Sequence, residues 1–196
     1  MPTTVIKNGK VISTTGVIAQ DVLVTDETIT ALGAPGYFDG VEQGADTVID
    51  AAGKYVIPGG IDVHTHMELP FGGTSAKDTF ESGTRAAAFG GTTTIVDFAV
   101  QSKGKSLREG LDAWHAKAEG NAVADYGFHQ IIGGVDEESL KAMEYLTEQE
   151  GITSFKLFMA YPGVFYSDDG QILRAMQTAG DVRQHDRAVR RLRLER

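Results

Sequence analysis

The stretch Gly59-Gly60-Ile61-Asp62-Val63-His64-Thr65-His66 closes an apolar run that begins at Tyr55 and is typical of a strand. Successive side chains of a strand point to opposite faces, so His64 and His66 present two imidazoles on one face. Two neutral imidazoles at this spacing suit Zn²⁺ and similar ions. A His-x-His pair also arises by chance in many chains, and the strand end with its flanking glycines is what favours a metal site here.

Downstream of this strand, strands and helices alternate about every 30 residues, which is the signature of βα units around a parallel sheet. The expected strands are 92–100, 126–133 and 154–161, and the expected helices are 76–89, 106–119, 136–149 and 168–178. Ser106 and Glu109 form a capping box at the start of the second helix. A closed (β/α)₈ barrel needs eight such units, so these four predict an α/β fold with half of a barrel over residues 57–180.

Residues 1–56 have a different rhythm, in which short β-branched or apolar runs are separated by turn residues. The expected strands are 4–6, 10–13, 17–24, 28–32 and 46–51. Asn8-Gly9 is a two-residue hairpin signal, so we expect the first two strands to pair with each other. These runs predict a small all-β unit in front of the α/β part.

The composition limits the chemistry and the partners. The chain has no cysteine, so a metal must be held by histidine, carboxylate or modified lysine. A net charge of −9 argues against nucleic acid or an anionic membrane as partner. No stretch approaches the roughly 18–20 apolar residues of a transmembrane helix, and the N-terminus lacks the layout of a secretory signal. We therefore expect a cytoplasmic protein.

Lys156 is anomalous, because it lies within the apolar run Ser154–Tyr161 and lysine is rarely buried without a partner. One interpretation is that the side chain extends to solvent or pairs with a carboxylate such as Asp97. The other is a desolvated amine with a lowered pKa, which is able to form a Schiff base or a carbamate. A carbamate is an anionic oxygen ligand that is able to bridge two metal ions. The sequence leaves both interpretations open.

Two carboxylates in strands have structural alternatives of equal standing. Asp97, in the buried strand 92–100, either orients a metal-binding histidine through a hydrogen bond or serves a backbone or threonine group. Asp62 follows the alternation of His64 and His66, and we expect it to support the site rather than to bind a metal.

The remaining histidines are weaker candidates. His129, in the third strand of the parallel sheet, is placed where it can face the barrel centre and contribute to the site. His115 lies on a helix beside Trp114, and we expect a surface or packing role. His185 falls in an arginine-rich segment and carries little weight.

Several long motifs, taken in order, resemble the D-hydantoinase and dihydropyrimidinase branch of the amidohydrolase superfamily. The resemblance covers about Thr4 to Gly180. Its most specific pieces are Val56–His66, Pro70–Thr74, Gly83–Thr93 and Phe155–Gly163.

This resemblance implies a small β-sandwich joined to a (β/α)₈ barrel that holds two divalent metal ions, zinc in the first place. His64 and His66 match two ligands of one zinc, and Lys156 matches the carboxylated lysine that bridges both metals. Tyr161 matches the tyrosine that polarises the substrate carbonyl. Water activated by the metals then opens dihydropyrimidines or 5-substituted hydantoins to N-carbamoyl amino acids. Full-length relatives form homotetramers or homodimers.

Other branches of the superfamily match less well. Dihydroorotases carry an arginine two residues after the second histidine, where this chain has Met67-Glu68. Allantoinases stay possible, although they match Pro70–Thr74 less closely. A non-catalytic relative, like the collapsin-response mediator proteins, is a further alternative, and the presence of His64, His66, Lys156 and Tyr161 argues against it.

The resemblance stops after about residue 180, where the composition also changes. Six of the nine arginines fall in residues 181–196. A basic amphipathic terminal helix is one interpretation of this tail, and a shifted reading frame or an early stop is the one we favour. The family's second-metal histidines and its catalytic aspartate lie on later strands. We therefore expect the chain to be incomplete and inactive alone.

Overall fold

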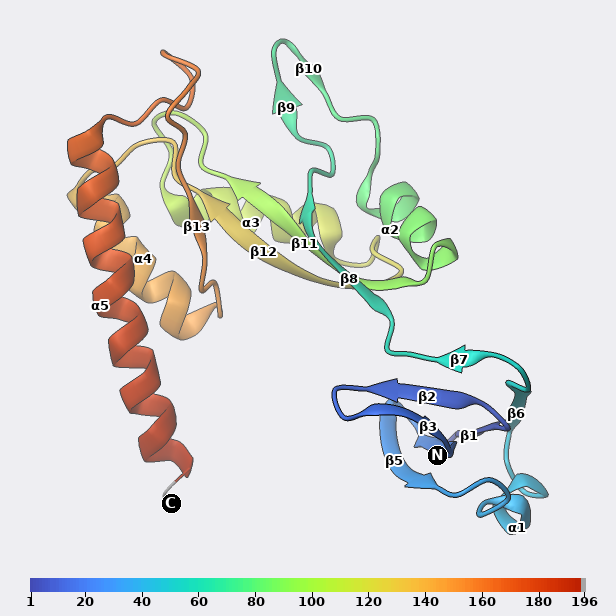
Figure 1. Ribbon diagram of the computed structural model, residues 1–196. Coiled ribbons are helices and arrows are strands. Elements are labelled where there is room, and N and C mark those ends of the chain that lie inside the picture. Colours follow the sequence, from blue (N-terminus) through green and yellow to red (C-terminus); the bar gives the residue numbers. More distant parts are fainter. Residues whose placement is uncertain (195–196) are drawn as a thin grey trace. The chain divides into compact units, whose positions relative to one another are not determined.

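The computed structural model describes the backbone of residues 1–194 and the side chains of residues 1–182 (Figure 1). By its internal contacts the chain divides into two compact units, Met1–Pro58 and Gly59–Arg196. Within the described residues, no helix combines the length and the apolar character that crossing a membrane requires.

The first unit contains two small sheets, with strand orders β5-β4-β1-β6 and β3-β2-β7. Its elements are β1 (Thr3–Lys7), β2 (Lys10–Ser13), β3 (Gly16–Ala19), β4 (Asp21–Thr25), β5 (Thr28–Gly33), α1 (Asp39–Glu42), β6 (Thr47–Asp50) and β7 (Tyr55–Val56). The buried carboxylate of Asp21 accepts hydrogen bonds from the amides of Asn8 (2.9 Å) and Gly36 (2.7 Å). Apolar burial is small, with Val5 and Val22 at its centre.

The hairpin expected at Asn8-Gly9 is wrong. Asn8 does have the positive φ of 63° that suits such a turn. However, β1 pairs with β4 and β6, whereas β2 pairs with β3 and β7, so the chain passes here from one sheet to the other. The single strand expected over 17–24 is also two strands, which Gln20 separates.

The second unit is built on a four-stranded parallel sheet in the order β13-β12-β11-β8. These strands are β8 (Gly60–Thr65), β11 (Thr92–Val100), β12 (Asp125–Ile131) and β13 (Phe155–Lys156). A two-stranded hairpin, β9 (Pro70–Phe71) and β10 (Thr74–Ser75), follows β8. Among the described residues β8 and β13 each have one neighbour in the sheet, so the sheet is open at both edges.

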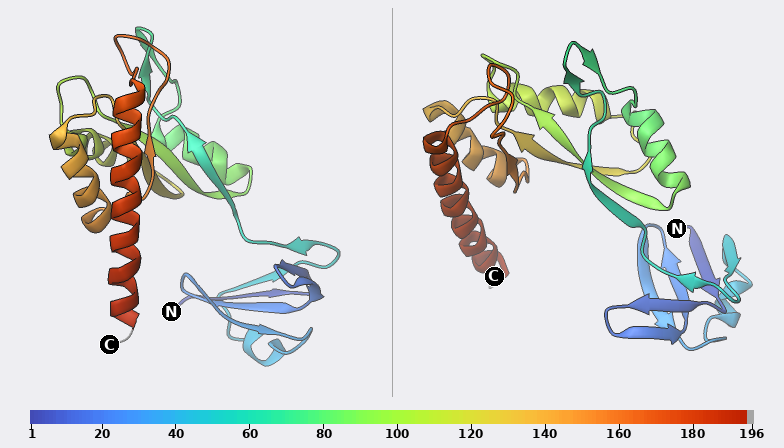
Figure 2. Two further views of the ribbon diagram at one scale, coloured as in Figure 1. Left: turned by 60° about the vertical axis from the view of Figure 1, so that its left-hand side comes forward. Right: turned by 45° about the horizontal axis from the view of Figure 1, so that its top comes forward.

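Four helices accompany this sheet: α2 (Phe80–Phe89), α3 (Leu107–Ala118), α4 (Glu137–Gln149) and α5 (Asp169–Leu194). Helices α2 and α3 contact β11, and α4 contacts α3 and α5 (Figures 1 and 2). Their apolar side chains meet those of the sheet in one core around Phe80, Ile95 and Leu111. The capping box at Ser106 and Glu109 is present, and a second one forms at Thr79 and Ser82.

The βα pattern of the second unit agrees with the sequence in order and type, but its bounds differ at several places. The helix expected over 76–89 begins only at Phe80. The strand expected over 154–161 is only Phe155–Lys156. The last helix does not stop at Gly180 but runs on to Leu194. Whether residues 181–196 are foreign to the fold stays a prediction.

Candidate active site

The candidate residues from three strands gather around the ring of Phe98 on β11. Its centroid lies 4.7 Å from that of His64, 5.0 Å from that of His66 and 4.7 Å from that of His129. The ammonium nitrogen of Lys156 lies 4.3 Å from the same centroid. The parallel register explains this gathering, because Phe98 pairs with His129 on the neighbouring strand. The sequence therefore brings His64, His66 and Lys156 to one place.

The two histidines of the His-x-His motif lie edge to face, with ring centroids 5.1 Å apart. Nδ1 of His66 is buried and has no hydrogen-bond partner among the described residues. Burial lowers the pKa of His66, and the positive charge of Lys156 lowers it further. Both effects favour the neutral imidazole, which is the form that binds metal ions.

Lys156 does not pair with Asp97. Within residues 1–182 no carboxylate lies within ion-pair distance of its amine, which is flanked by the rings of Phe98 and, at 4.8 Å, Phe158. Burial lowers the pKa of this amine. The neutral amine, which is the nucleophilic form, is therefore more populated than in a solvated lysine.

Asp97 lies on the face of β11 opposite to that of Phe98, and its side chain is fully buried. Its Oδ2 accepts hydrogen bonds from the hydroxyl of Thr65 and the amide of Met67, both at 2.8 Å. Its Oδ1 accepts from the indole of Trp114 at 2.9 Å and from the amide of Phe98 at 2.8 Å. The sequence left two roles open for Asp97. The structure shows the second of them, in which Asp97 accepts hydrogen bonds from a threonine and from backbone amides.

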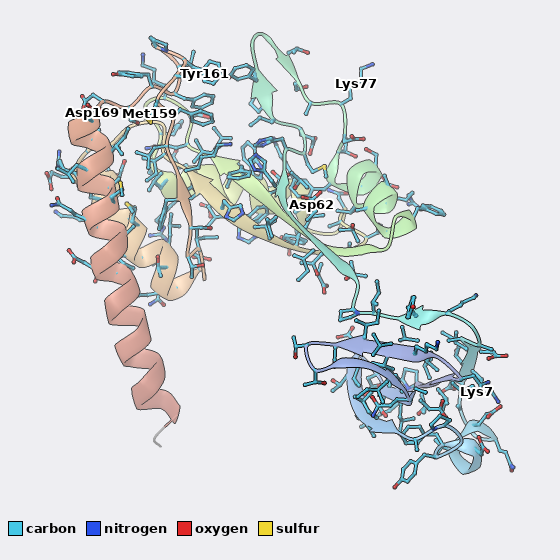
Figure 3. The ribbon with its side chains drawn as sticks, viewed as in Figure 1. Lys7, Asp62, Lys77, Met159, Tyr161 and Asp169 are labelled. Atoms are coloured by element: carbon cyan, nitrogen blue, oxygen red, sulfur yellow. The ribbon has the colours of Figure 1, made fainter. Side chains whose placement is uncertain are left out.

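Asp62 has a supporting contact, since its Oδ1 accepts a hydrogen bond from the amide of His64 at 3.0 Å. Its alternation with His64 and His66 is interrupted, because the register of β8 against β11 shifts between Asp62 and Thr65. Figure 3 shows Asp62 on β8 and Tyr161 on the loop that follows β13.

The other histidines have contacts that occupy them elsewhere. Nε2 of His129 lies 2.9 Å from the carbonyl of Val63, and Nδ1 is hydrogen-bonded to the hydroxyl of Ser154. Both ring nitrogens are thus used inside the fold, so His129 contacts the site without a free ligand atom. His115 packs edge to face on Phe128, as a packing residue is expected to do. His185 lies outside the residues whose side chains are described.

Tyr161 lies in an aromatic group with Phe71 of the β9–β10 hairpin (ring centroids 5.0 Å apart) and Phe158 (5.7 Å). Its φ is +63°, and its carbonyl accepts hydrogen bonds from the amides of Val164 and Phe165. No contact joins Tyr161 to the histidine pair among the described residues. The hairpin and Phe98 were not singled out from the sequence. Phe98 becomes evident only from the register of β11 against β12, which pairs it with His129.

The residues at this site are of types that bind metal ions, but they are too few to complete a metal coordination shell. Two imidazoles, one of them with an unpartnered buried nitrogen, and a desolvated amine meet at one site. Within the described residues no three His, Cys, Asp or Glu side chains are grouped as a metal site requires. The amine of Lys156 is the nitrogen group that lies beside the two imidazoles at this site.

Comparison with known proteins agrees with the motifs. The chain is 67% identical to the D-hydantoinase of Streptomyces coelicolor over 178 residues, which are 91% of this chain and 38% of that protein. It is 38% identical to the dihydropyrimidinase of Rattus norvegicus, over 90% of this chain and 34% of that protein. The crystal structure of the dihydropyrimidinase from Brevibacillus agri superposes with a TM-score of 0.85 at 44% identity, over 92% of this chain and 38% of the other.

The chain thus spans little more than a third of the length of the relatives it matches. The resemblance to D-hydantoinases and dihydropyrimidinases is confirmed along nine-tenths of its own length. The model of the amidohydrolase family matches residues 55–181, which are more than half of the chain and include the histidine pair and Lys156, and the chain therefore belongs to the amidohydrolase family.

Proposed function

We propose that this chain carries part of the active site of a metal-dependent cyclic amidohydrolase. The reaction is the opening of dihydropyrimidines or 5-substituted hydantoins to N-carbamoyl amino acids. The observation that carries the proposal is His66, whose buried Nδ1 has no hydrogen-bond partner in the described structure and which lies beside His64 and Lys156. The similarity to D-hydantoinases and dihydropyrimidinases supports the choice of ring substrate.

His64 and His66 would hold one divalent ion, and Lys156 would bridge it to a second after reaction with CO₂. In that reaction the lone pair of the neutral amine forms an N–C bond to CO₂, one C–O π bond of CO₂ opens to give a carboxylate, and the nitrogen releases one proton to water. The low-polarity surroundings of the amine favour the neutral form that reacts. Zinc is the proposed metal, because imidazole and oxygen donors without thiolates suit it.

The bound metals would supply a water of lowered pKa and a polarised substrate carbonyl. The chain's own residues do the rest. Tyr161 would donate its phenolic hydrogen to the carbonyl oxygen and stabilise the negative charge that develops there. The aromatic group of Phe71, Phe158 and Tyr161 would exclude water beside the ring of the substrate.

The complete site needs donors beyond this group, since two imidazoles and one carbamate do not fill two metal coordination shells. We propose that residues 57–180 form the first four units of a (β/α)₈ barrel and that later strands carry the remaining ligands. Residues 1–56 would form part of the accompanying β-sandwich. The open edges of the sheet at β8 and β13 are where a closed barrel would continue.

A chimera tests this assignment. The 178-residue segment of the Streptomyces coelicolor D-hydantoinase that aligns with this chain is replaced by the corresponding segment of this chain, and hydantoin and dihydrouracil opening is measured with and without Zn²⁺. We expect metal-dependent activity. Lys156→Ala and His66→Ala should abolish it, and Tyr161→Phe should lower kcat about 10²–10³-fold, as loss of an oxyanion donor does.

His115→Gln is the matched control, because His115 packs on Phe128 and takes no part in the proposed site. It should leave kcat unchanged. A chimera that folds and loads metal but opens neither ring would contradict the proposal. A folded chimera without metal would instead favour a non-catalytic relative.

A further inference from the structure

The ladder between β8 and β11 is broken where the two histidines lie. Ile95 pairs with Asp62 and Asp97 pairs with Thr65, so two residues of β8 lie opposite one residue of β11. Such a bulge re-aims side chains and leaves backbone groups without ladder partners. The position of the histidines is therefore not fixed by the regular sheet.

At this bulge, the side chain of Asp97 provides hydrogen bonds to β8 and to the residues that follow it. Thr65 and Met67 point to the helix-covered face of the sheet, and their hydroxyl and amide both donate to Oδ2 of Asp97 at 2.8 Å. His64 and His66 alternate with them and point to the other face, against Phe98. Thr65 and Met67 are the neighbours of His66 in the chain. Their hydrogen bonds to Asp97 therefore hold the backbone on both sides of His66.

Helix α3 holds this arrangement in place. The indole of Trp114 donates to Oδ1 of Asp97 at 2.9 Å. One turn later, the amine of Lys117 lies 4.1 Å from the centroid of the Trp114 ring and donates to the carbonyl of Glu68 at 3.3 Å. Asp97 is thus a buried carboxyl group with four donors, and each donor would lose its partner if this side chain were lost.

We propose that Asp97 is a positioning residue for the His64–His66 pair and that it acts through the hydroxyl of Thr65 and the amide of Met67. This inference rests on the proposed function, because it concerns how a metal would be held. Groups that orient metal ligands by hydrogen bonds commonly change metal affinity 10–100-fold when they are removed. Asp97 orients the ligands through their strand rather than through their rings.

The test uses the chimera with the Streptomyces coelicolor D-hydantoinase, which carries the later strands, with Co²⁺ as a spectroscopic probe and Zn²⁺ as a competitor. Thr65→Val removes the hydroxyl and keeps the shape of the side chain, and Thr65→Ser restores the hydroxyl. Thr65→Val should weaken Co²⁺ binding about tenfold or more and shift the visible absorption bands of the bound ion. Thr65→Ser should return both to the wild-type values.

Thr147→Val is the matched control, because it is the same substitution at another buried threonine. The hydroxyl of Thr147 bonds the carbonyls of Met143 and Ile152 on the far side of the core. Thr147→Val should lower the unfolding temperature at least as much as Thr65→Val. It should leave the Co²⁺ affinity within about twofold of wild type and the spectrum unchanged. Asp97→Asn, if it folds, should lose more affinity than Thr65→Val.

Each outcome decides. Wild-type affinity and spectrum in Thr65→Val overturn the inference, as does a loss of affinity that merely follows the unfolding temperature across both valine variants. If the chimera without these substitutions shows no Co²⁺ binding that His64→Asn or His66→Asn removes, the proposed function fails at this site and the inference falls with it. Specific wild-type binding that Thr65→Val leaves unchanged sinks the inference alone.

Discussion

The end of β8 and the end of β13 both bring candidate residues to the site, and they are held in different ways. Hydrogen bonds reach the β8 end from Asp97, from His129 and from Lys117, each on a different element. Lys156 on β13 has the backbone ladder to β12 and two aromatic rings, but no hydrogen bond to its amine in the described part of the chain. One half of the site is thus positioned by the rest of the fold, and the other half is positioned mainly by its own strand.

This difference predicts where substitutions cost stability. Changes behind β8 should destabilise the protein, because they leave buried groups without partners. Changes at the Lys156 amine should affect chemistry without a loss of stability. The two halves of the site can therefore be separated by measuring unfolding and metal binding on the same variants.

The largest effect is expected for Gly110→Ala on α3. A Cβ at this position would lie 2.6 Å from the carbonyl oxygen of Val100, so the helix that carries Trp114 must move away from β11. Overpacking of this kind costs about 1–3 kcal/mol, and the contact with rigid backbone places this site at the upper end. Urea unfolding measures it.

Gly180→Ala is the control for that change. Among the described residues, no atom outside the helix's own backbone lies within 4 Å of the added methyl, and alanine is the better helix former by up to about 1 kcal/mol. The control should leave stability unchanged or raise it. Gly110→Ala within about 0.5 kcal/mol of wild type would show that α3 does not support the β8 end as closely as described.

The second effect is that of His129→Phe, which keeps an aromatic ring beside Phe98 and removes two hydrogen bonds. The carbonyl of Val63, at the bulge of β8, loses its contact, and so does the hydroxyl of Ser154. We expect a loss of about 1–2 kcal/mol. His115→Phe, which removes no hydrogen bond that the structure shows for that ring, should stay within about 0.5 kcal/mol of wild type. Equal losses of stability in His129→Phe and His115→Phe would show that the two hydrogen bonds of His129 do not stabilise the fold.

The sequence predicted the parts of this arrangement that depend on local pattern. The strand 92–100 and the capping box at Ser106 were placed correctly, because burial on both faces and side-chain capping are local signals. The bulge in β8 and the hairpin β9–β10 were not predicted. A bulge depends on the register against another strand, which no run of residues in β8 specifies.

Two incorrect expectations have the same origin. Asn8-Gly9 has the chemistry of a hairpin turn, but the partners of β1 and β2 lie far along the chain. The run 154–161 is apolar enough for a long strand, but only Phe155 and Lys156 find partners on β12. The resemblance to a known family led us to expect Lys156 beside His64 and His66, whereas the Phe98 ring between them became visible only with the sheet register.

A smaller effect is expected at Asp136, which begins helix α4 on the β13 side of the sheet. Its Oδ1 accepts a hydrogen bond from the amide of Ser139 at 2.7 Å, and this bond lowers the pKa of Asp136. A carboxyl whose pKa is lower in the folded state adds stability above its unfolded pKa, near 4, and loses it as the pH falls further. Asp136→Ala should cost about 1 kcal/mol at pH 7.

Asp136→Asn separates capping from charge, because asparagine caps a helix but does not titrate. Its stability relative to wild type should rise as the pH falls from about 5 to about 2, measured by urea unfolding at each pH. A difference that stays constant over this range would show that the charge of Asp136 contributes nothing.

The smallest change in stability is expected from Lys156→Met, and it gives the clearest contrast between the two halves. Lys156 and Lys117 both place an amine over an aromatic ring, at 4.3 Å from the centroid of Phe98 and 4.1 Å from the centroid of Trp114. Only Lys117 also donates a hydrogen bond, to Glu68 behind β8. Methionine fills a similar volume without a charge to desolvate, so Lys156→Met should keep or slightly raise the unfolding temperature while metal binding is lost.

Lys117→Met should do the opposite, lowering the unfolding temperature by a few degrees and leaving the Co²⁺ spectrum intact. The two lysines are expected to differ because of what their amines contact and not because of how deeply they are buried. If Lys156→Met destabilises the protein as much as Lys117→Met, the amine of Lys156 has a structural partner. The β13 half of the site would then be anchored like the β8 half, and its lysine would no longer be free for the proposed chemistry.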